Sequence, residues 1–582
     1  MFGLLGRYLK SFWKQMLLIF IFTVAQAIVQ TSLPKYFNEI IKKGVSKGDV
    51  KYIWHVGIIM LSLTVVLGIC MMIAGYFSAY VTASFTTNIR SDLFRKIQKF
   101  SDLDYVNYSK ETLLTRANSD TTQMQVVVIN MLRNAMLVPF IAVFTFIRCI
   151  MLDAPLSFVL VLALVISTFI VRRGNKRSMP HFRMLQDKTD RVSTLMNEKL
   201  TGARSIRAFS RQDYEVEKLS KANEDVRDTA IEANNYIVHL MPIVQVIMNL
   251  VIVLILILGP FQLKSKSVEL ADLMTFIQYS SMLASGFATI MAIVNALPKC
   301  EVSASRIKEI LDYEVQEEMP DSEAVKVSDP KGEIVFKDVS FGYSGADENV
   351  LHDINLVIPA GKTTAIVGAT GSGKSTLLKL IPMFFDNRFE GNIFIDGVDT
   401  KKMKTHDIRD IISYAPQKAN LFSGTVESNL KVAKPDADSE DIKKACDMAC
   451  VTEFLEAKET DASLVLTQGG GNLSGGQRQR VSVARAFIRD ASIYLLDDTF
   501  SALDFKTDAA VRKAMYRELA GKTIVVVAQR IATIMNADKI VVMDKGRIVA
   551  EGTHKEILDS CEIYKEIYET QTGLEDKEGR AS

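Results

Sequence analysis

Two segments of this chain carry residue types that bind phosphate and a divalent cation. The first, Gly368–Ser375, reads GATGSGKS and fits the pattern GxxxxGK[ST]. Its glycines would let backbone N–H groups converge on phosphate, Lys374 would reach the β- and γ-phosphates, and Ser375 would hold Mg²⁺. The second, Ser492–Asp498, reads SIYLLDD and predicts a buried strand that ends in carboxylates. Asp497 fits the magnesium-assisting carboxylate that follows a phosphate-binding loop.

The sequence around these motifs predicts the elements that would position them. TTAIVG before the glycine-rich loop is a strand pattern and STLLKLI after it is a helix pattern, which is the context that the loop requires. A third motif, LSGGQ at Leu473–Gln477, precedes the helix pattern RQRVSVARAF. A glycine-rich turn before a helix is commonplace alone, but the three motifs in this order and spacing are very specific.

Composition divides the 582 residues into two halves. Hydrophobic residues make up 48% and charged residues 23%, and the mean hydropathy is +0.15, because the first 300 or so residues hold long apolar runs. The remainder is typical of a soluble α/β domain. A net charge of +2 gives no sign of nucleic-acid binding. The six cysteines include no CxxC pair, so we expect buried thiols; Cys446 and Cys450 lack the further ligands that a metal site would need.

Six apolar segments approach the roughly 20 residues that a membrane span requires. No clear cleavage site follows the first segment, so we expect it to be retained. Only Asp153–Pro155 separates the third and fourth segments, which predicts a tight hairpin. The segments run approximately over Met16–Tyr36, Val56–Tyr80, Val127–Leu152, Leu156–Val171, Ile237–Phe261 and Leu273–Pro298.

The N-terminal stretch MFGLLGRYLKSFWK alternates apolar and aromatic residues with Arg7, Lys10 and Lys14. This pattern favours a helix lying in the membrane interface over a simple flank of the first span. Inside the spans, Arg148 either faces a substrate cavity or extends towards the nearby outer interface. The amides of Gln26, Gln30, Gln245, Asn249 and Gln278 are expected to join helices.

Basic residues predict which connections face the cytoplasm. Arg and Lys concentrate in residues 85–125 and 172–235, so the positive-inside rule makes both stretches cytoplasmic. They are too long and too helix-prone to be plain loops, so we expect them to extend the spans beyond the bilayer and to expose short turns near Glu111–Asp120 and Asn197–Phe209. The first outer connection departs from the rule, with Lys35, Lys42, Lys43, Lys47 and Lys51.

These patterns predict three parts. Residues 1–311 form a membrane α-helical domain of six spans with long cytoplasmic extensions and an N-terminal interfacial helix. Residues 312–330, acidic and without apolar periodicity, form a linker. Residues 331–582 form an α/β P-loop nucleotide-binding domain.

With six spans followed by these three motifs, essentially the whole chain resembles an ABC exporter half-transporter of the multidrug-resistance type. In that family Gly368–Ser375 is the Walker A loop and LSGGQ is the signature. The resemblance implies that Tyr343 stacks on adenine, that Gln417 senses Mg²⁺ and meets the membrane domain, and that SALD at Ser501–Asp504 crosses the dimer interface. The turns near Glu111–Asp120 and Asn197–Phe209 resemble coupling helices. The implied ATP-binding residues are Tyr343, Gly368, Gly371, Gly373, Lys374, Ser375, Thr376, Gln417, Ser474, Gly475, Gly476, Gln477, Asp497 and Asp504, with Mg²⁺ held by Ser375 and Gln417 and, through water, by Asp497.

The resemblance also implies a dimer in which each ATP lies between the Walker A loop of one subunit and the signature of the other. Two catalytic positions depart from the family. Asp498 stands where such cassettes usually carry Glu, and Gln529 where they usually carry His. Asp is one methylene shorter, and Gln cannot become an imidazolium. TQGGGN at Thr467–Asn472 replaces the family's acidic loop before the signature.

We therefore expect a degenerate ATP site in one half of a heterodimer, with hydrolysis mainly at the partner's Walker A loop. The expected function is ATP-driven export of amphipathic or drug-like compounds across the cell membrane, with membrane lipids around the spans and with the cassette and both termini in the cytoplasm. The alternatives are a homodimeric exporter of lipid or peptide and an ATP-gated membrane sensor that does not pump.

Overall fold

The computed structural model describes residues 2–578 except 265–268, 316–323, 344 and 347. The chain divides into two compact units. The membrane unit comprises Met1–Gln98 and Lys110–Tyr313, and the cassette unit comprises Lys99–Ser109 and Glu314–Ser582. Part of the expected linker lies outside the described residues. The short segment Lys99–Ser109, expected within the membrane domain, belongs to the cassette unit.

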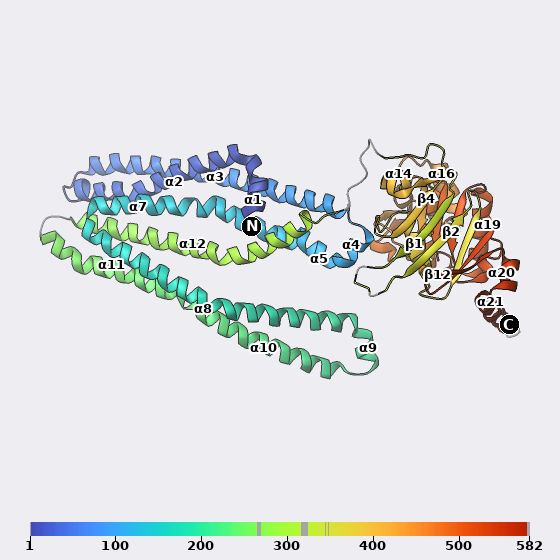
Figure 1. The fold of residues 1–582 in the computed structure, drawn as a ribbon. Helices are drawn as coiled ribbons and strands as arrows, with labels where there is room; N and C mark the ends of the chain where they lie inside the picture. Colours follow the sequence, from blue (N-terminus) through green and yellow to red (C-terminus); the bar gives the residue numbers. More distant parts are fainter. Residues whose placement is uncertain (1, 265–268, 316–323, 344, 347, 579–582) are drawn as a thin grey trace. The chain divides into compact units, whose positions relative to one another are not determined.

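The membrane unit is built of helices (Figure 1). Among its described residues, three π-helical turns interrupt or extend the α-helices, at Ile40–Val45, Arg116–Asp120 and Met131–Ala135. The α-helices are α1 (Phe2–Leu9), α2 (Trp13–Glu39), α3 (Val50–Ile97), α5 (Lys110–Thr115), α6 (Thr121–Asn130), α7 (Leu137–Leu152), α8 (Ala154–Thr201), α9 (Ala203–Ala208), α10 (Gln212–Val238), α11 (Leu240–Lys264) and α12 (Leu270–Leu311).

The helices agree with the expected spans. Among the described residues, five helical stretches are long and apolar enough to cross a membrane, and they include α2, α3, α7, α8 and α12. The remaining expected span corresponds to α11, of which Pro242–Ile257 forms a shorter apolar helix. The tight hairpin is confirmed: α7 ends at Leu152, and the Asp153 carboxylate caps α8 by accepting the Leu156 N–H at 2.9 Å.

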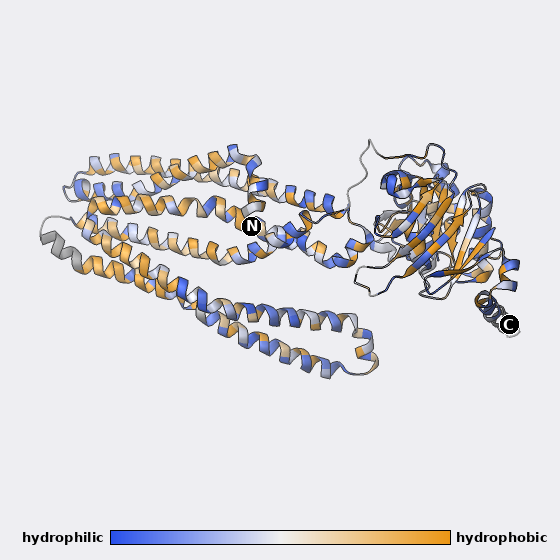
Figure 2. Cartoon of the chain, in the orientation of Figure 1, coloured by the Kyte–Doolittle hydropathy of each residue, from blue (hydrophilic) through white to orange (hydrophobic). Residues whose placement is uncertain are grey.

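Two of the spanning helices continue well past the length of a span, as expected. Both α3 and α8 contain 48 residues, which at about 1.5 Å per residue is more than twice the thickness of a bilayer core of about 30 Å. Figure 2 shows that the first part of α8 is mostly apolar, whereas its second part and α10 are mostly hydrophilic. These extensions therefore have the composition of water-exposed helices.

The N-terminal stretch forms a helix of its own, α1, separated from α2 by a short 3₁₀ turn. Its apolar side chains Leu4, Leu5 and Tyr8 are buried. The Tyr8 ring packs edge-on against Phe85 of α3, and its hydroxyl donates to Asp92 at 2.7 Å. Part of its apolar face is thus covered by protein.

Polar contacts join α2 to α12 near the α2–α3 connection. The buried Asp272 carboxylate accepts hydrogen bonds from Asn38 and Lys42, each at 2.8 Å. Lys42 is one of the lysines in the first outer connection that depart from the positive-inside rule, and this ion pair gives it a structural role. Deeper in the unit, Arg148 donates to the Ser32 hydroxyl at 3.5 Å and is half-buried. The role of Arg148 in a substrate cavity stays a prediction.

The described residues of the cassette unit form two main sheets and a two-stranded pair, β7 (Gly424–Thr425) with β8 (Val465–Leu466). One sheet is antiparallel, in the order β2 (Leu351–Ile358), β1 (Ile334–Phe341), β4 (Glu390–Ile395) and β5 (Val398–Asp399). The other has the order β12 (Arg547–Gly552), β11 (Lys539–Asp544), β3 (Thr363–Gly368), β10 (Thr523–Val527), β9 (Ile493–Asp497) and β6 (Ile412–Ala415), and only β12 is antiparallel to its neighbour.

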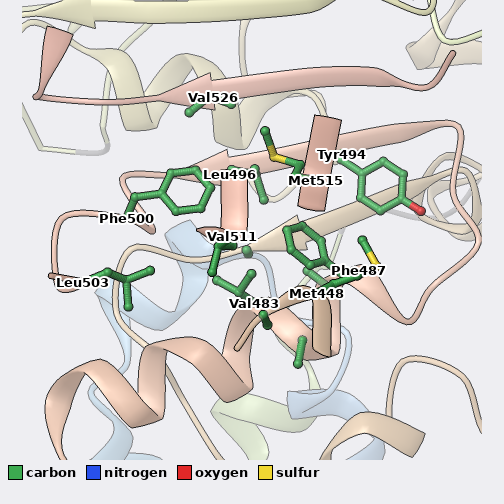
Figure 3. Close-up of a cluster of buried hydrophobic side chains, with 14 of the residues drawn as sticks. Met448, Val483, Phe487, Tyr494, Leu496, Phe500, Leu503, Val511, Met515 and Val526 are labelled. Carbon is green, nitrogen blue, oxygen red and sulfur yellow. The ribbon is translucent and has the colours of Figure 1, made fainter. Parts of the chain in front are cut away.

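The described part of the cassette unit also contains helices, some of which pack on this second sheet and others on one another. They are α13 (Lys374–Leu380), α14 (Thr405–Asp410), α15 (Val426–Lys431), α16 (Ser439–Met448), α17 (Val451–Glu456), α18 (Gly475–Phe487), α19 (Phe505–Glu518), α20 (His554–Ser560) and α21 (Glu562–Glu578). Figure 3 shows part of the larger core, where Val483 and Phe487 of α18 and Val511 and Met515 of α19 pack with Leu496 of β9. Burial of these apolar side chains fixes α18 and the strand that ends at Asp497 in one framework.

The first of the two expected coupling turns, near Glu111–Asp120, was predicted too far along the chain. Residues Glu111–Asp120 are helical, in α5 and the π turn that follows. The turn after α3 instead lies at α4 (Asp102–Asn107), which begins with a capping box in which Ser101 and Asp104 cap each other's backbone N–H. Leu103 enters the smaller cassette core, and Asp104, fully buried, pairs with Arg388 at 2.9 Å. The second expected turn agrees with the structure, because α8 ends at Thr201 and α9 follows.

Candidate nucleotide site

Parallel strands bring the predicted site segments to one edge of a sheet. The glycine-rich loop follows β3, Gln417 follows β6, Asp498 follows β9 and Gln529 follows β10. In the registers, Val527 pairs with both Asp497 and Ile366. Ligands of open α/β sheets bind at the carboxyl ends of the strands, so the topology places all four segments where a ligand would bind.

The glycine-rich loop depends on conformations that only glycine adopts without strain. Gly371 and Gly373 have φ values of 84° and 95°, in the left-handed region. A Cβ on Gly373 would lie 2.7 Å from Leu351, and one on Gly368 would lie 2.1 Å from the Met543 carbonyl oxygen. The loop leads directly into α13, whose N-cap is Gly373, so it presents the positive end of a helix dipole.

Lys374 is the cation of this loop and is largely buried. Its Nζ donates hydrogen bonds to the carbonyl oxygens of Gly368 at 2.9 Å and Ala369 at 2.7 Å. Burial lowers the pKa of Lys374, whereas the Asp498 and Asp497 carboxylates act in the opposite direction. The Lys374 ammonium can replace these two neutral carbonyl acceptors with phosphate oxygens when a nucleotide binds.

Ser375 and Asp497 form an oxygen pair that fits Mg²⁺. The Ser375 hydroxyl donates to Asp497 Oδ1 at 2.6 Å, and Asp497 is buried. Hydroxyl, carboxylate and water oxygens are the ligands that this cation prefers. The Gln417 amide, also expected to bind Mg²⁺, donates instead to Asp498 Oδ2 at 3.2 Å. Its role as a magnesium ligand stays a prediction.

The two unusual residues, Asp498 and Gln529, contact each other. Gln529 Nε2 donates to Asp498 Oδ2 at 2.9 Å, so this one oxygen accepts from both Gln529 and Gln417. Burial raises the pKa of the Asp498 carboxyl, and the hydrogen bonds from Gln417 and Ser501 partly offset the effect. Asp498 also has φ 48°, a left-handed conformation that Asp and Asn tolerate better than longer side chains.

Comparison with known proteins agrees with this geometry. Residues 16–286 match the family model of the ABC transporter transmembrane region, and residues 351–501 match the ABC transporter model. An uncharacterized ABC transporter ATP-binding protein of Bacillus subtilis, YfiB, is 32% identical over 558 residues, which is 96% of each chain. The chain belongs to the ABC transporter family.

Two further comparisons refine the family and the fold of this ABC transporter. The ATP-dependent lipid A-core flippase of Desulfotalea psychrophila is 31% identical over 562 residues, covering 96% of this chain and 95% of the flippase. The structure of a bacterial Atm1-family ABC exporter with ATP bound superposes with a TM-score of 0.81 at 20% identity, covering 97% of this chain and 99% of that one. The chain thus has an ABC exporter fold, with a helical membrane domain fused to an ATP-binding domain.

Tyr343 lies beside the Walker A helix of this ABC transporter. Its hydroxyl is 3.1 Å from the hydroxyl of Thr376, and its ring packs edge-on against Phe341 and Phe385. The ring is therefore held near the loop by three contacts, while the residue is only half-buried. This position is compatible with the predicted stacking on adenine.

The signature residues form the exposed start of α18. Ser474 is the N-cap, its hydroxyl accepts the Gln477 N–H at 3.2 Å, and Gln477 accepts the Ser474 N–H at 3.0 Å. Gly475 and Gly476 occupy the first turn of the helix. Within the part of the chain that the structure describes, no hydrogen bond or ion pair joins Ser474–Gln477 or Asp504 to the Walker A loop. Asp504 caps α19 by accepting the Thr507 N–H at 3.1 Å, and hydrogen bonds from the Thr507 side chain and then from its backbone lower the pKa of Asp504.

One residue at this site was missed by the sequence interpretation. Tyr414 of β6 donates its hydroxyl to Asp497 Oδ2 at 3.2 Å. It lies three residues before Gln417, and the parallel pairing of β6 with β9 brings it beside the strand that ends at Asp497. The only available signal was its place in the predicted strand before Gln417, which does not distinguish a core tyrosine from a site residue.

Proposed function

We propose that this chain is one half of a heterodimeric exporter that moves amphipathic or drug-like compounds across the cell membrane by alternating access, and that its own ATP site is degenerate. Membership of the ABC transporter family and the exporter fold support transport. The relative named as a lipid A-core flippase supports an amphipathic cargo. The cassette and both termini lie in the cytoplasm in this proposal, because the basic stretches are predicted to be there.

The observation that carries the degenerate site is the contact between Gln529 and Asp498. A carboxylate that polarises attacking water needs an accessible oxygen close to that water, yet Asp498 Oδ2 accepts from two amides. The shorter side chain also displaces the carboxylate, and a displacement of about 1 Å costs on the order of 10²-fold in rate. Gln529 cannot supply the positive charge of an imidazolium to the transition state.

The remaining ATP-binding features support retention of the nucleotide. The hydrogen bonds of Lys374 with the loop and of Ser375 with Asp497 support binding of phosphate and Mg²⁺, so ATP at this site would act as a long-lived clamp. The exposed N-terminus of α18 would serve the ATP bound by the partner, because helix N-termini bind phosphate. Hydrolysis would then occur mainly on the partner's Walker A loop. ATP would favour the closed pair of cassettes by binding it more tightly than the open one.

A first experiment compares the ATPase activity of the purified chain alone with that of the chain purified together with a candidate partner, a half-transporter from an adjacent reading frame. We expect low turnover from the chain alone and full turnover from the pair. Full turnover by the chain alone would instead establish a homodimer with a competent site.

A matched pair of variants in the co-purified complex locates the hydrolysing site. Gly475→Asp fits the fold, since nothing lies within 4 Å of a Cβ there and acidic residues suit the first turn of a helix, but its charge repels phosphate. We expect Gly475→Asp to lower turnover on the order of 10²-fold, comparable to the loss of one group that stabilises transition-state charge. Asp498→Asn should change it by less than about twofold, because a group outside the hydrolysing site contributes almost nothing to the barrier. Equal losses from both variants would contradict the division of labour.

Transport is tested in reconstituted vesicles that contain fluorescent amphiphiles. An exporter accumulates the amphiphile in vesicles whose cassettes face outwards, and it does so only with hydrolysable ATP. ATP turnover without accumulation of any amphiphile would favour the membrane sensor.

A further inference from the structure

Tyr414 contacts the predicted magnesium carboxylate although it belongs to neither the phosphate loop nor the signature. Its hydroxyl donates to Asp497 Oδ2, while the Ser375 hydroxyl donates to Oδ1 of the same carboxylate at 2.6 Å. A phenol keeps its proton at neutral pH, so the Tyr414 hydroxyl remains a donor to Asp497. When Ser375 is engaged by Mg²⁺, Tyr414 remains as a side chain that orients Asp497.

The ring of Tyr414 packs on Phe384, which lies in the segment after α13. The two ring centroids are 5.2 Å apart and the rings are nearly perpendicular, at 81°. Phe384 is itself held in place by Arg409. The Arg409 guanidinium lies 5.4 Å from the Phe384 ring centroid and donates to the carbonyl oxygens of Pro382 and Met383, each at 3.0 Å. A shift of the Tyr414 ring would therefore press on Phe384, which Arg409 holds in place.

Phe384 in turn contacts α4, the helix that follows the long helix α3. The Phe384 carbonyl oxygen accepts the backbone N–H of Asp102, the first residue of α4, at 2.9 Å. The Tyr414 side chain, the Phe384 ring and the Phe384 backbone thus connect the predicted magnesium carboxylate to α4 without using Gln417.

We propose that Tyr414 is a positioning residue for Asp497 and that, with Phe384, it transmits occupancy of the magnesium–ATP site to α4. The proposal rests on the ATP and Mg²⁺ binding of the proposed function but does not depend on a partner or on hydrolysis. The alternative is that Tyr414 only fills the core between β6 and its neighbours. Removal of the hydroxyl alone separates the two, since the ring would still fill that space.

Binding of a fluorescent ATP analogue to the full-length chain, titrated with Mg²⁺, tests the first step. We expect Tyr414→Phe to raise the Mg²⁺ concentration for half-maximal binding about tenfold, as the loss of a hydrogen bond to a charged group would. Binding in excess chelator should be unchanged. The matched control is Tyr494→Phe on the neighbouring strand β9, which removes a hydrogen bond of 2.6 Å from a buried tyrosine to the Arg489 carbonyl. Its Mg²⁺ dependence should equal that of the wild type.

Amide hydrogen exchange of residues 99–109, with and without Mg²⁺ and ATP, tests the second step. In the wild type we expect Mg²⁺–ATP to change this exchange. Phe384→Leu should abolish the change while it leaves the Mg²⁺ dependence of binding intact. Tyr414→Leu, which removes both the hydroxyl and the ring, should show both defects. A wild-type Mg²⁺ dependence in Tyr414→Phe, or an unaltered exchange response in Phe384→Leu, would overturn the proposal. Failure of the wild-type chain to bind Mg²⁺–ATP at all would instead refute the proposed function.

Discussion

The side-chain amide of Gln529 donates a 2.9 Å hydrogen bond to the Asp498 carboxylate, so the two residues that depart from the family pattern are direct partners. Residues in contact generally have non-additive effects. The pair is therefore best changed together, and the single changes serve as controls.

Asp498→Glu combined with Gln529→His should create a competent site in the chain alone. We expect ATP turnover to rise by up to about 10²-fold, because the longer carboxylate recovers about 1 Å of reach and the imidazole can carry charge. Asp498→Glu and Gln529→His alone should each give a smaller gain. The left-handed backbone at position 498, with φ 48°, should make the Glu variant slightly less stable. No gain in the double variant would mean that another feature limits hydrolysis.

The raised pKa of Asp498 predicts a dependence of stability on pH. Burial disfavours the charged carboxylate, so the folded state takes up a proton here at a higher pH than the unfolded chain does. Stability from this group therefore increases as the pH falls through the raised pKa. We expect Asp498→Asn to unfold at a higher temperature than the wild type at pH 7, with the difference shrinking towards acid. A constant difference across the pH range would contradict this sign.

The ion pair of Asp104 with Arg388 should stabilise the attachment of α4 to the cassette. Asp104 is fully buried, so Arg388→Met removes the cation that pairs with it, and breaking a buried ion pair costs about 3–5 kcal/mol. We expect a lower unfolding temperature and faster proteolysis within residues 99–109. Asp353→Asn is the control, because its 3.2 Å pair with Arg547 is exposed and such pairs contribute at most about 1 kcal/mol. Equal shifts in the two variants would show that burial of Asp104 does not matter.

Two glycines of similar conformation separate strain from nucleotide binding. Gly371 in the phosphate loop and Gly521 before β10 have φ values of 84° and 82°, and nothing lies within 4 Å of a Cβ at either position. Alanine at each should cost a similar 1–2 kcal/mol or so of backbone strain. Only Gly371→Ala should also weaken ATP binding, by roughly tenfold, since glycine there permits the backbone to approach phosphate. Unchanged affinity in Gly371→Ala would argue against that approach.

Local patterns predicted much of this molecule. The strand, loop and helix around Lys374 and the hairpin at Asp153 are fixed by neighbouring residues, and the spans follow from apolar length alone. The position of the turn after α3 was not predicted, because residues 85–125 are polar and helix-prone throughout. The capping pattern at Ser101 and Asp104 was a usable signal for the start of α4. Its attachment to the cassette could not be predicted, because Arg388, which pairs with Asp104, is 284 residues away. The contact of Tyr414 with Asp497 likewise depends on strand pairing.

The docking of α4 on the cassette has a consequence for how the chain is made. Asp104 is synthesised 284 residues before Arg388, and at about 5–20 residues per second the ribosome takes roughly 15–60 s to produce the second after the first. During that interval Leu103, which ends up in the cassette core, has no pocket to enter. The cassette therefore completes its fold around a segment that is already tethered to inserted helices, and nascent chains that stop short of Arg388 carry an uncovered apolar side chain for chaperones and proteases to recognise.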